Sequence, residues 1–525
     1  MTAQENQNAD HSANYSQSLM LWAAPILSAL VGWSVWKFGG LETLEATTLG
    51  IALWTALWWI FEAVPIPVAS LLPLSLLPLF KILDPKVVGE KYGHPLVLLL
   101  LGGFLLSKAM EKSGAHRRIA LMMINACPAG EKFLILGFMV ATAFLSMWIS
   151  NTATTLMMLP MALAVIQNSR SEALKIPLLL GIAFAANVGG IGTPIGTPPN
   201  LVMIGAHTDL EEEVPLSDII GRHPSEDITN PANPKEVIIK AGDKISEEIA
   251  LALESSGLSH IQAHRIEISF TEWMKFGVPV TVTMVLVIWL WLSRGITGKE
   301  RIALPDPGTW RKPEVRTLLV FGLTALAWIT RSEPYGGWKT WLDLPKANDA
   351  SVAFVAVIFL FCLPSGEKKG ERLLDWKTAN QIPWGMLVLV GAGLCLGEGF
   401  KQSGLSATIA GVFTGIENLP LLGLLLGIAL LVTFMTEMTS NTATTNVLMP
   451  ILGAAAVASD LDPKLLMIPA AISASCAFML PVATIPNAVV FGTGEVTVRR
   501  MAREGLVLNL IGALVVSGIC YLLLS

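Results

Sequence analysis

The chain has 525 residues, of which 53% are hydrophobic and only 14% are charged. A soluble domain carries about 25% charged residues. This composition and the mean hydropathy of +0.60 therefore exclude a soluble fold and predict an all-α polytopic membrane protein. The formal net charge of −5 implies no particular partner, because the charges are spread over loops on both sides of a membrane.

The N-terminal residues 1–17 form a polar tail without Lys or Arg. A cleavable signal peptide begins with a basic segment, so the first apolar span is expected to remain as a membrane anchor. Five cysteines lie in or beside apolar stretches without CxxC spacing and are interpreted as core residues. Several apolar runs approach the length of about 20 residues that a helix needs to cross a hydrocarbon core. They include residues 19–36, 276–292, 318–329, 352–363 and 506–524.

A polar hexapeptide, Ser-Asn-Thr-Ala-Thr-Thr, occurs twice, at residues 150–155 and 440–445. Other segments match at nearly the same spacing, so the chain is a duplicated unit. The matched segments are residues 113–114 with 403–404, at an offset of 290 positions, and residues 194–200 with 481–487, at an offset of 287.

Each half has two predicted interruptions. The first is a re-entrant helical hairpin, at residues 132–167 and 418–458, because the apolar arms beside each hexapeptide are short for a full crossing. The second is a Gly/Pro stretch, at residues 189–200 and 480–487, where proline removes amide donors and disfavours helix in the preceding residue. We expect each stretch to unwind a spanning helix. Interrupted helices in repeated halves are a signature of secondary transporters.

Basic residues gather in three loops, which the positive-inside rule places in the cytoplasm. If Arg117 and Arg118 also lie inside, the span at 95–111 runs inward and its repeat counterpart at 385–401 runs outward. The two halves are therefore predicted to be inverted in the membrane, with the N-terminus inside and the C-terminus outside. The three loops contain Arg294, Lys299, Arg301, Arg311, Lys312 and Arg316; Lys368, Lys369, Arg372 and Lys377; and Arg499, Arg500 and Arg503.

The interrupted segments carry neutral polar groups. Free carbonyls, hydroxyls and amide oxygens suit a hard cation, whereas helix amino termini and hydroxyl or amide donors suit an anion. Residues 177–205 contain no charged side chain, and residues 466–496 contain only Glu495. A bound cation would supply the countercharge, since two unit charges about 4 Å apart attract by about 4 kcal/mol at an effective dielectric of 20. This predicts cation coupling, with a protonated substrate as the alternative.

Together the motifs resemble the divalent anion/sodium symporter family. The resemblance rests on the doubled hexapeptide, on the segments at 196–200 and 483–487, and on residues 61–67 and 272–279, and it covers roughly residues 20–206 and 270–525. It implies eleven spanning helices with two re-entrant hairpins, a homodimer with scaffold and transport domains, and elevator-type alternating access. It also implies import of di- or tricarboxylates, or of sulfate in some branches, usually with sodium. We predict sodium as the coupling ion and no organic cofactor.

The same resemblance implies the site residues. At Ile485 the sequence departs from the second Thr-Pro-Pro-Asn of the family, so the wall facing the substrate changes its shape and apolarity. The first sodium site would comprise Ser146, Ser150, Asn151 and Gly196, and the second Thr436, Thr439, Asn441 and Ala483. The substrate would meet Asn151, Thr152, Asn441 and Thr442, with Thr197, Thr484 and Ile485 nearby.

Other interpretations remain open at this point. The hydroxyls of Ser146, Thr436 and Thr439 could instead bond to a carbonyl one turn earlier. Glu437 beside the second tip is expected to bond to the hairpin backbone, with a proton relay as the alternative. All seven histidines lie outside the apolar cores, which disfavours a Ser/His intramembrane hydrolase. The sequence contains no HExxH or paired-aspartate motif, and we predict that the protein is not an enzyme. Counterflow kinetics would separate a carrier from a channel.

The polar segment 207–270 contains thirteen Asp or Glu against five Lys or Arg. It is predicted to be a small extracytoplasmic insert without a transport role. Its expected elements are a strand at 235–240, a helix at 244–253 and a strand at 264–270.

The remaining boundaries follow from the repeats. Residues 18–206 hold the first span and most of the first repeat, residues 271–316 its end and a cytoplasmic loop, and residues 317–525 the second repeat. The predicted function is sodium-coupled import of small dianions, with C4-dicarboxylates such as succinate, fumarate or malate first. Sulfate or other inorganic dianion symport and sodium-independent dicarboxylate exchange are the alternatives. The predicted setting is the lipid bilayer of a bacterial inner membrane, in a homodimer and without nucleic acid.

Overall fold

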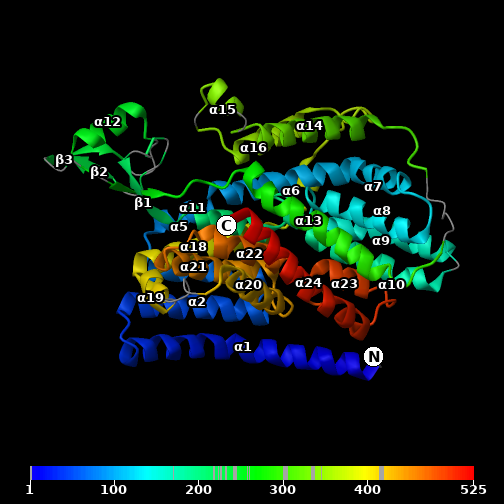
Figure 1. Ribbon diagram of the computed structural model, residues 1–525, viewed down its shortest axis with the longest axis horizontal. Helices are drawn as coiled ribbons and strands as arrows, with labels where there is room; N and C mark the ends of the chain where they lie inside the picture. Colours follow the sequence, from blue (N-terminus) through cyan, green and yellow to red (C-terminus); the bar gives the residue numbers. More distant parts are fainter. Residues whose placement is uncertain are drawn as a thin grey trace. The chain divides into compact units, whose positions relative to one another are not determined.

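The computed structural model describes residues 3–169, 171–216, 219–220, 222, 224, 227–230, 233–240, 245–256, 258, 260–298, 306–332, 337–344, 346–412 and 419–524. These residues are mostly helical (Figure 1), so the predicted all-α membrane fold is confirmed. The chain divides into two compact units, one formed by residues 1–203 and 269–525 and the other by Ile204–Ile268.

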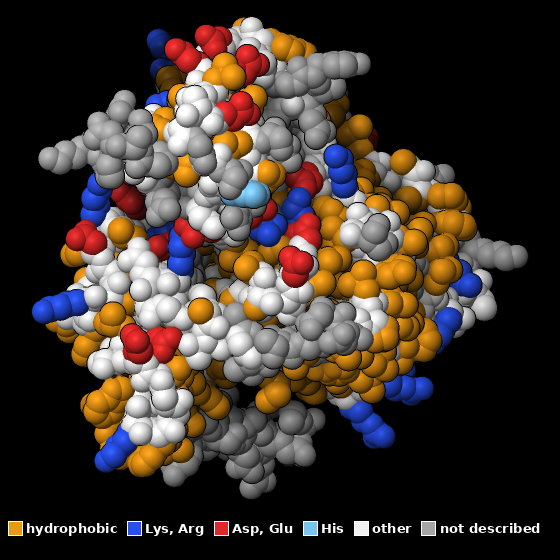
Figure 2. Space-filling model, turned by 60° about the vertical axis from the view of Figure 1, so that its left-hand side comes forward, with side chains coloured by type: hydrophobic (Ala, Val, Ile, Leu, Met, Phe, Trp, Pro, Cys, Tyr) orange, Lys and Arg blue, Asp and Glu red, His pale blue; other side chains and the backbone are white. Residues whose placement is uncertain are grey.

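Among the described residues, seven helices are long and apolar enough to cross a membrane. Broad hydrophobic areas cover much of the face in Figure 2, as a surface in contact with acyl chains requires. The predicted count of eleven spans stays a prediction. The seven segments are α1 (Ala3–Phe38) from Gln17 onward, α2 (Thr43–Phe61), α5 (Pro85–Tyr92) with α6 (Pro95–Ser113), α10 (Glu172–Gly189) with η1 (Gly190–Gly192), α13 (Phe270–Leu292), α18 (Trp384–Ser403) and α24 (Val498–Leu524).

Two helical hairpins lie where the sequence predicts them, and each duplicated hexapeptide ends the hairpin tip and begins the second arm. Each hairpin tip is a four-residue turn, at residues 147–150 and 437–440. In the first tip Ser150 caps the second arm, because its hydroxyl accepts a hydrogen bond from the amide of Ala153. The arms are α8 (Glu131–Ser146) and α9 (Asn151–Asn168) in the first half, and α20 (Leu421–Thr436) and α21 (Asn441–Ala458) in the second.

The Gly/Pro stretches interrupt helices in both halves, as predicted. After η1 the chain continues without helix until α11 (Pro198–Thr208) begins. In the second half, α22 (Pro463–Ala474) ends and α23 (Ile485–Phe491) starts after a gap of irregular backbone at 475–484. Proline stands at the first or second position of α23 and at the start of α11, where its missing amide hydrogen is tolerated.

The duplication is also visible where α6 meets α7 (Ala115–Asn125) and where α18 meets α19 (Leu405–Val412). Gly114 and Gly404 end the first helix of each pair with φ values of 78° and 87°. The left-handed conformation is readily available only to glycine. The hydroxyl oxygens of Ser113 and Ser403 each accept a hydrogen bond from the backbone amide two residues later in the chain, at 3.4 Å. Both halves therefore change direction by the same local device.

Helices α13 and α24 support the two interruptions in equivalent ways. A Cβ added to Gly277 would lie 2.3 Å from the carbonyl oxygen of Ile191, and one added to Gly505 would lie 2.2 Å from that of Phe478. The two glycines are 228 positions apart, whereas the two carbonyls are 287 apart, because the insert lengthens only the first half. The close contact fixes each helix against the unwound backbone.

The remaining helices of the first unit are shorter or less apolar. They are α3 (Ile66–Ala69), α4 (Leu71–Leu79), α14 (Lys312–Ile329), α15 (Gly337–Trp341), α16 (Asp349–Cys362) and α17 (Trp376–Ala379).

The second unit is a small α+β body. Strand β1 (Glu211–Pro215) pairs antiparallel with β4 (His260–His264), β2 (Ile228–Asn230) pairs with β3 (Asn233–Ile239), and α12 (Glu247–Ser255) follows β3. The predicted strand at 264–270 is wrong: β4 ends at His264 because its partner begins at Glu211, and the chain then leads to Ser269, which caps α13. Strands β1 and β2 were not predicted from the sequence.

Candidate cation and anion site

The first hairpin tip is held by the hydroxyl of Ser146, the last residue of α8. Its Oγ lies 2.6 Å from Oδ1 of Asn151 and 2.7 Å from the carbonyl oxygen of Ala186 in α10. The Ser146 side chain is completely buried. A hydroxyl that donates keeps its two lone pairs. These atoms therefore form a compact group of neutral oxygens that a cation can use.

The second tip repeats this arrangement. Oγ1 of Thr436 lies 2.8 Å from Oδ1 of Asn441 and 3.0 Å from the carbonyl oxygen of Ala474 in α22. The hydroxyls of Ser146 and Thr436 thus donate to a neighbouring helix, and not to a carbonyl one turn earlier. The duplicated sequence produces a duplicated hydrogen-bond pattern.

The first Gly/Pro stretch packs directly on the first tip. A Cβ on Gly190 would lie 2.8 Å from Oδ1 of Asn151 and 3.1 Å from Cβ of Thr197. A Cβ on Gly196 would lie 2.4 Å from the carbonyl oxygen of Gly190 and 3.0 Å from that of Met147. The structure therefore brings Asn151 and Gly196, which the sequence assigns to a sodium site, close to Thr197, which it assigns to the substrate.

In each interruption a buried asparagine holds the irregular backbone in place by hydrogen bonds. Nδ2 of Asn200 donates to the carbonyl oxygens of Gly190 at 2.9 Å and Thr193 at 2.8 Å. In the second half, Nδ2 of Asn487 donates to those of Ala477 and Leu480, both at 3.1 Å. Each residue in the first set matches its counterpart in the second set at an offset of 287 positions, so the same hydrogen bonds shape both unwound segments.

Glu437 breaks the symmetry of the two halves. Its buried carboxylate accepts the backbone amides of Phe478 at 2.7 Å, Met479 at 2.8 Å and Leu480 at 2.9 Å, and Nδ2 of Asn509 in α24 at 2.7 Å. The amides belong to the unwound segment after α22. The expected bond to the hairpin backbone is therefore corrected: Glu437 fixes the second interruption against the second tip, because three free amides there need an acceptor.

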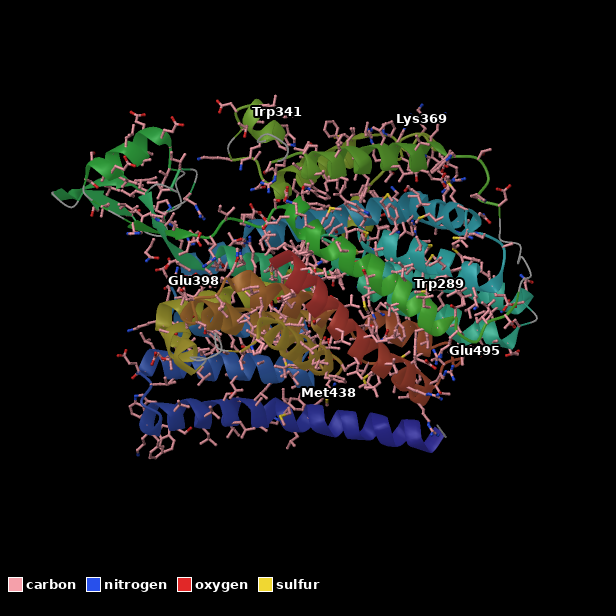
Figure 3. All side chains as sticks on the ribbon, viewed as in Figure 1. Trp289, Trp341, Lys369, Glu398, Met438 and Glu495 are labelled. Atoms are coloured by element: carbon pink, nitrogen blue, oxygen red, sulfur yellow. The ribbon has the colours of Figure 1, made fainter. Side chains whose placement is uncertain are left out.

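The other residues assigned to the second site are less closely joined. The Thr439 hydroxyl donates to the carbonyl of Met435 one turn earlier, at 3.0 Å, and also bonds to the Thr444 hydroxyl. The back-bonding alternative therefore describes Thr439 in this structure. Ala483 is buried and lies in the unwound segment. Met438, which Figure 3 labels at the second tip, is 77% exposed.

Donors for an anion stand at the start of the second hairpin arms. Helices α9 and α21 begin at Asn151 and Asn441, so their free amides and positive dipole ends face the tips. Thr152 is half-buried and Thr442 is buried in the first turn of each arm. Ile485 opens α23 with its side chain 59% exposed.

The donor set fits sodium. Within the described part of the chain, no group of three or more His, Cys, Asp or Glu is placed to hold a metal ion. The clustered ligands are instead hydroxyl, amide and carbonyl oxygens, which suit a hard cation and not a transition metal. Ser146, Asn151 and the backbone near Gly196 would hold one ion, and Thr436 and Asn441 would contribute to a second.

Two functional candidates were missed by sequence reasoning. Asn187 in α10 and Asn509 in α24 are buried, and both make hydrogen bonds to the second half of the site. The signal that could have found them is a lone amide side chain within an apolar span, which marks a functional position in membrane proteins.

Comparisons with known proteins define the family. A family model described as citrate transporter matches residues 56–465. A protein of Staphylococcus saprophyticus named sodium-dependent dicarboxylate transporter SdcS is 34% identical, over 99% of this chain and 93% of its own. The protein of the same name from Staphylococcus aureus strain USA300 is 34% identical over 90% and 85%.

These matches show that the chain belongs to the transporter family of the matched model, of the divalent anion/sodium symporter type, which confirms the resemblance drawn from the paired motifs. Among solved structures, MtrF of Neisseria gonorrhoeae shares the fold with a TM-score of 0.50 and 14% identity, over 85% of this chain and 84% of that one.

Proposed function

We propose that this protein imports small dianions together with sodium, and that C4-dicarboxylates such as succinate, fumarate and malate are its main substrates. The observation that carries the proposal is the duplicated oxygen group at Ser146–Asn151 and Thr436–Asn441, set among residues without a basic side chain. A dianion bound there needs cations as its countercharge. The names of the two staphylococcal relatives agree with this chemistry.

Contacts among the basic loops support the proposed orientation in the membrane. Ion pairs and hydrogen bonds connect all three of them, so they lie on one side, and the positive-inside rule makes that side cytoplasmic. We therefore propose that the N-terminus lies inside and the C-terminus outside. The connecting pairs are Arg311 with Glu367 at 3.7 Å, Arg316 with the Pro364 carbonyl at 2.6 Å, Arg294 with Glu504 at 2.7 Å and Arg118 with Glu314 at 2.6 Å.

We propose elevator-type alternating access in a homodimer. Glu437 and Asn187 fasten the hairpins and broken helices to each other, so this group can move as one body. A second group comprises α18 with α2, α4 and α5 and borders the hairpin arm α21. Within it Glu398, labelled in Figure 3, pairs with Lys91 at 3.1 Å. That second group would serve as the scaffold.

Binding of sodium and substrate should be mutually dependent. Calorimetric titration of the purified protein with succinate is expected to give tighter binding in sodium chloride than in choline chloride, by about 5- to 150-fold. By linkage, succinate should raise the sodium affinity by the same factor. Equal succinate affinity in both salts would refute symport and favour sodium-independent exchange. Tight sodium-dependent binding of sulfate without succinate binding would select the inorganic dianion alternative.

Ile485 is expected to discriminate against large substrates. Isoleucine adds a branched apolar wall where proline would stiffen the turn. Citrate should therefore compete poorly with succinate, and Ile485→Pro should shift the relative preference toward citrate by about tenfold while sodium dependence remains. Competition assays that rank citrate and succinate equally in the wild type, or identically in both proteins, would contradict this role. Ile266→Pro, an exposed isoleucine outside the site, is the control.

A further inference from the structure

Asn187 occupies a position that joins the two halves of the site. It lies in α10 of the first half, close to the helix end at Gly189, and its side chain is 1% exposed. Its Nδ2 lies 3.2 Å from the Ala477 carbonyl oxygen, 3.1 Å from Oγ1 of Thr484 and 3.2 Å from Oδ1 of Asn487. All three acceptors belong to the second interruption.

The direction of these hydrogen bonds follows from the backbone. The carbonyls of Ala477 and Leu480 can only accept, so Nδ2 of Asn487 must face them. Oδ1 of Asn487 then faces Asn187, which must present its own Nδ2. Nδ2 of Asn187 has two hydrogens. One serves Oδ1 of Asn487, and the other goes to the hydroxyl oxygen of Thr484 at 3.1 Å, because the Ala477 carbonyl is farther away and already accepts from Asn487. The orientation of Asn187 is fixed by groups that have no alternative.

Thr484 accepts a second hydrogen bond. It is the N-cap of α23, and its Oγ1 accepts the backbone amide of Asn487 at 3.3 Å. A hydroxyl has two lone pairs and one proton. With both lone pairs engaged by Asn187 and Asn487, the Thr484 hydroxyl retains only its proton for a ligand. Its side chain is half-buried, so that proton can reach a molecule at the site.

We infer that Asn187 is a positioning residue that makes Thr484 a donor to the carboxylate of the substrate and prevents it from serving as a sodium ligand. The inference rests on the proposed function and adds a specificity mechanism to it. The hydroxyls of Ser146 and Thr436 have the opposite hydrogen-bond direction. They donate within the protein and keep lone pairs for a cation. Ala186 and Ala474 present equivalent carbonyls to the two tips, and the residue after Ala474 is Ser475, so the second half has no asparagine at the position of Asn187.

A double-mutant cycle tests this role. Asn187→Ala and Thr484→Val should each raise the succinate Kd about ten- to a hundredfold, as expected for a lost hydrogen bond to a charged group. The double variant should bind no more weakly than Thr484→Val alone, because Asn187 acts through Thr484. Losses that multiply in the double variant would overturn the inference. Thr484→Ser keeps the hydroxyl and should keep its sensitivity to Asn187→Ala.

Asn446→Ala provides the matched control. Asn446 is also a buried amide, and its Nδ2 donates to the Leu389 carbonyl at 2.8 Å. Its combination with Thr484→Val should be additive in succinate affinity. If it shows the same coupling as Asn187, the effect is one of general packing and the inference fails.

Sodium binding without substrate gives a readout that does not depend on the folding of Asn187→Ala. Thr484→Val should leave the sodium Kd of the substrate-free protein unchanged while weakening succinate binding. Weaker substrate-free sodium binding would make Thr484 a cation ligand and overturn the inference. A wild-type protein that binds no dicarboxylate in sodium would instead refute the proposed function, so the two failures are distinguishable.

Discussion

Alanine at Asn151 or at Asn441 is expected to abolish sodium-dependent succinate uptake. Each amide oxygen accepts the hydroxyl of Ser146 or Thr436, and each residue also opens a helix whose free amides face the tip. Removing the side chain takes away a cation ligand and leaves a buried hydroxyl with one acceptor fewer. Loss of a buried hydrogen-bond partner destabilises by about 1–3 kcal/mol, and loss of a ligand shared by ion and substrate should reduce uptake by about a hundredfold or more.

The purified variants should still fold. Their melting temperatures are expected to stay close to that of Asn168→Ala, the same substitution at the exposed far end of α9, which should transport normally. Wild-type uptake by both Asn151→Ala and Asn441→Ala would contradict the site. An effect confined to one of them would show that the two halves are not equivalent in binding.

Glu437→Gln is expected to weaken both stability and sodium binding. The carboxylate offers two oxygens to three backbone amides and to Asn509. An amide side chain keeps one oxygen and turns an NH₂ group toward donors, so at least one buried amide loses its acceptor. The unwound segment after α22 should then lose its fixed position beside the second tip. We expect the half-saturating sodium concentration to rise about tenfold or more, together with a lower melting temperature.

Glu398→Gln separates these two effects. Glu398 is another carboxylate within a span, but it pairs with Lys91 and accepts from Gln402. Its substitution should lower the melting temperature and leave the sodium dependence unchanged. If Glu437→Gln and Glu398→Gln affect sodium activation alike, Glu437 has no specific part in the cation site. A bell-shaped pH dependence that disappears in Glu437→Gln would favour the proton-relay alternative.

The placement of the hairpins and interruptions could be predicted because their causes are local. The polar hexapeptide ends the apolar pattern, Ser150 caps the next arm, and proline and glycine prevent helix at residues 193–197. The repeat made the second copy predictable from the first. Local signals of this kind survive folding because no distant partner is needed to produce them.

The residues that fix the site could not be predicted because their partners are distant in sequence. Asn187 bonds to residues about 290–300 positions away, and Asn509 meets Glu437 across 72 positions. A single asparagine in an apolar span indicates that some partner exists, but the sequence does not say which carbonyl or hydroxyl it reaches. Thr439 illustrates the reverse case, because its position in the motif suggested a ligand and its hydroxyl bonds back to Met435.

Strand β1 of the insert was the most difficult element to predict from the sequence. Strand β1 begins with three glutamates, whose charge argues against a strand, yet its partner β4 and the buried side chains of Val214 and Ile261 hold it in a sheet. Strand propensity depends on such pairing more than on the residues alone.

Uptake of radiolabelled succinate into proteoliposomes measures the central claim most directly. The purified protein should accumulate succinate when sodium is high outside, and accumulation should vanish when choline replaces sodium or when an ionophore collapses the sodium gradient. Parallel vesicles with labelled sulfate should show far less uptake. Succinate uptake that is equal in sodium and choline and that requires dicarboxylate inside the vesicles would contradict sodium-coupled import and establish exchange.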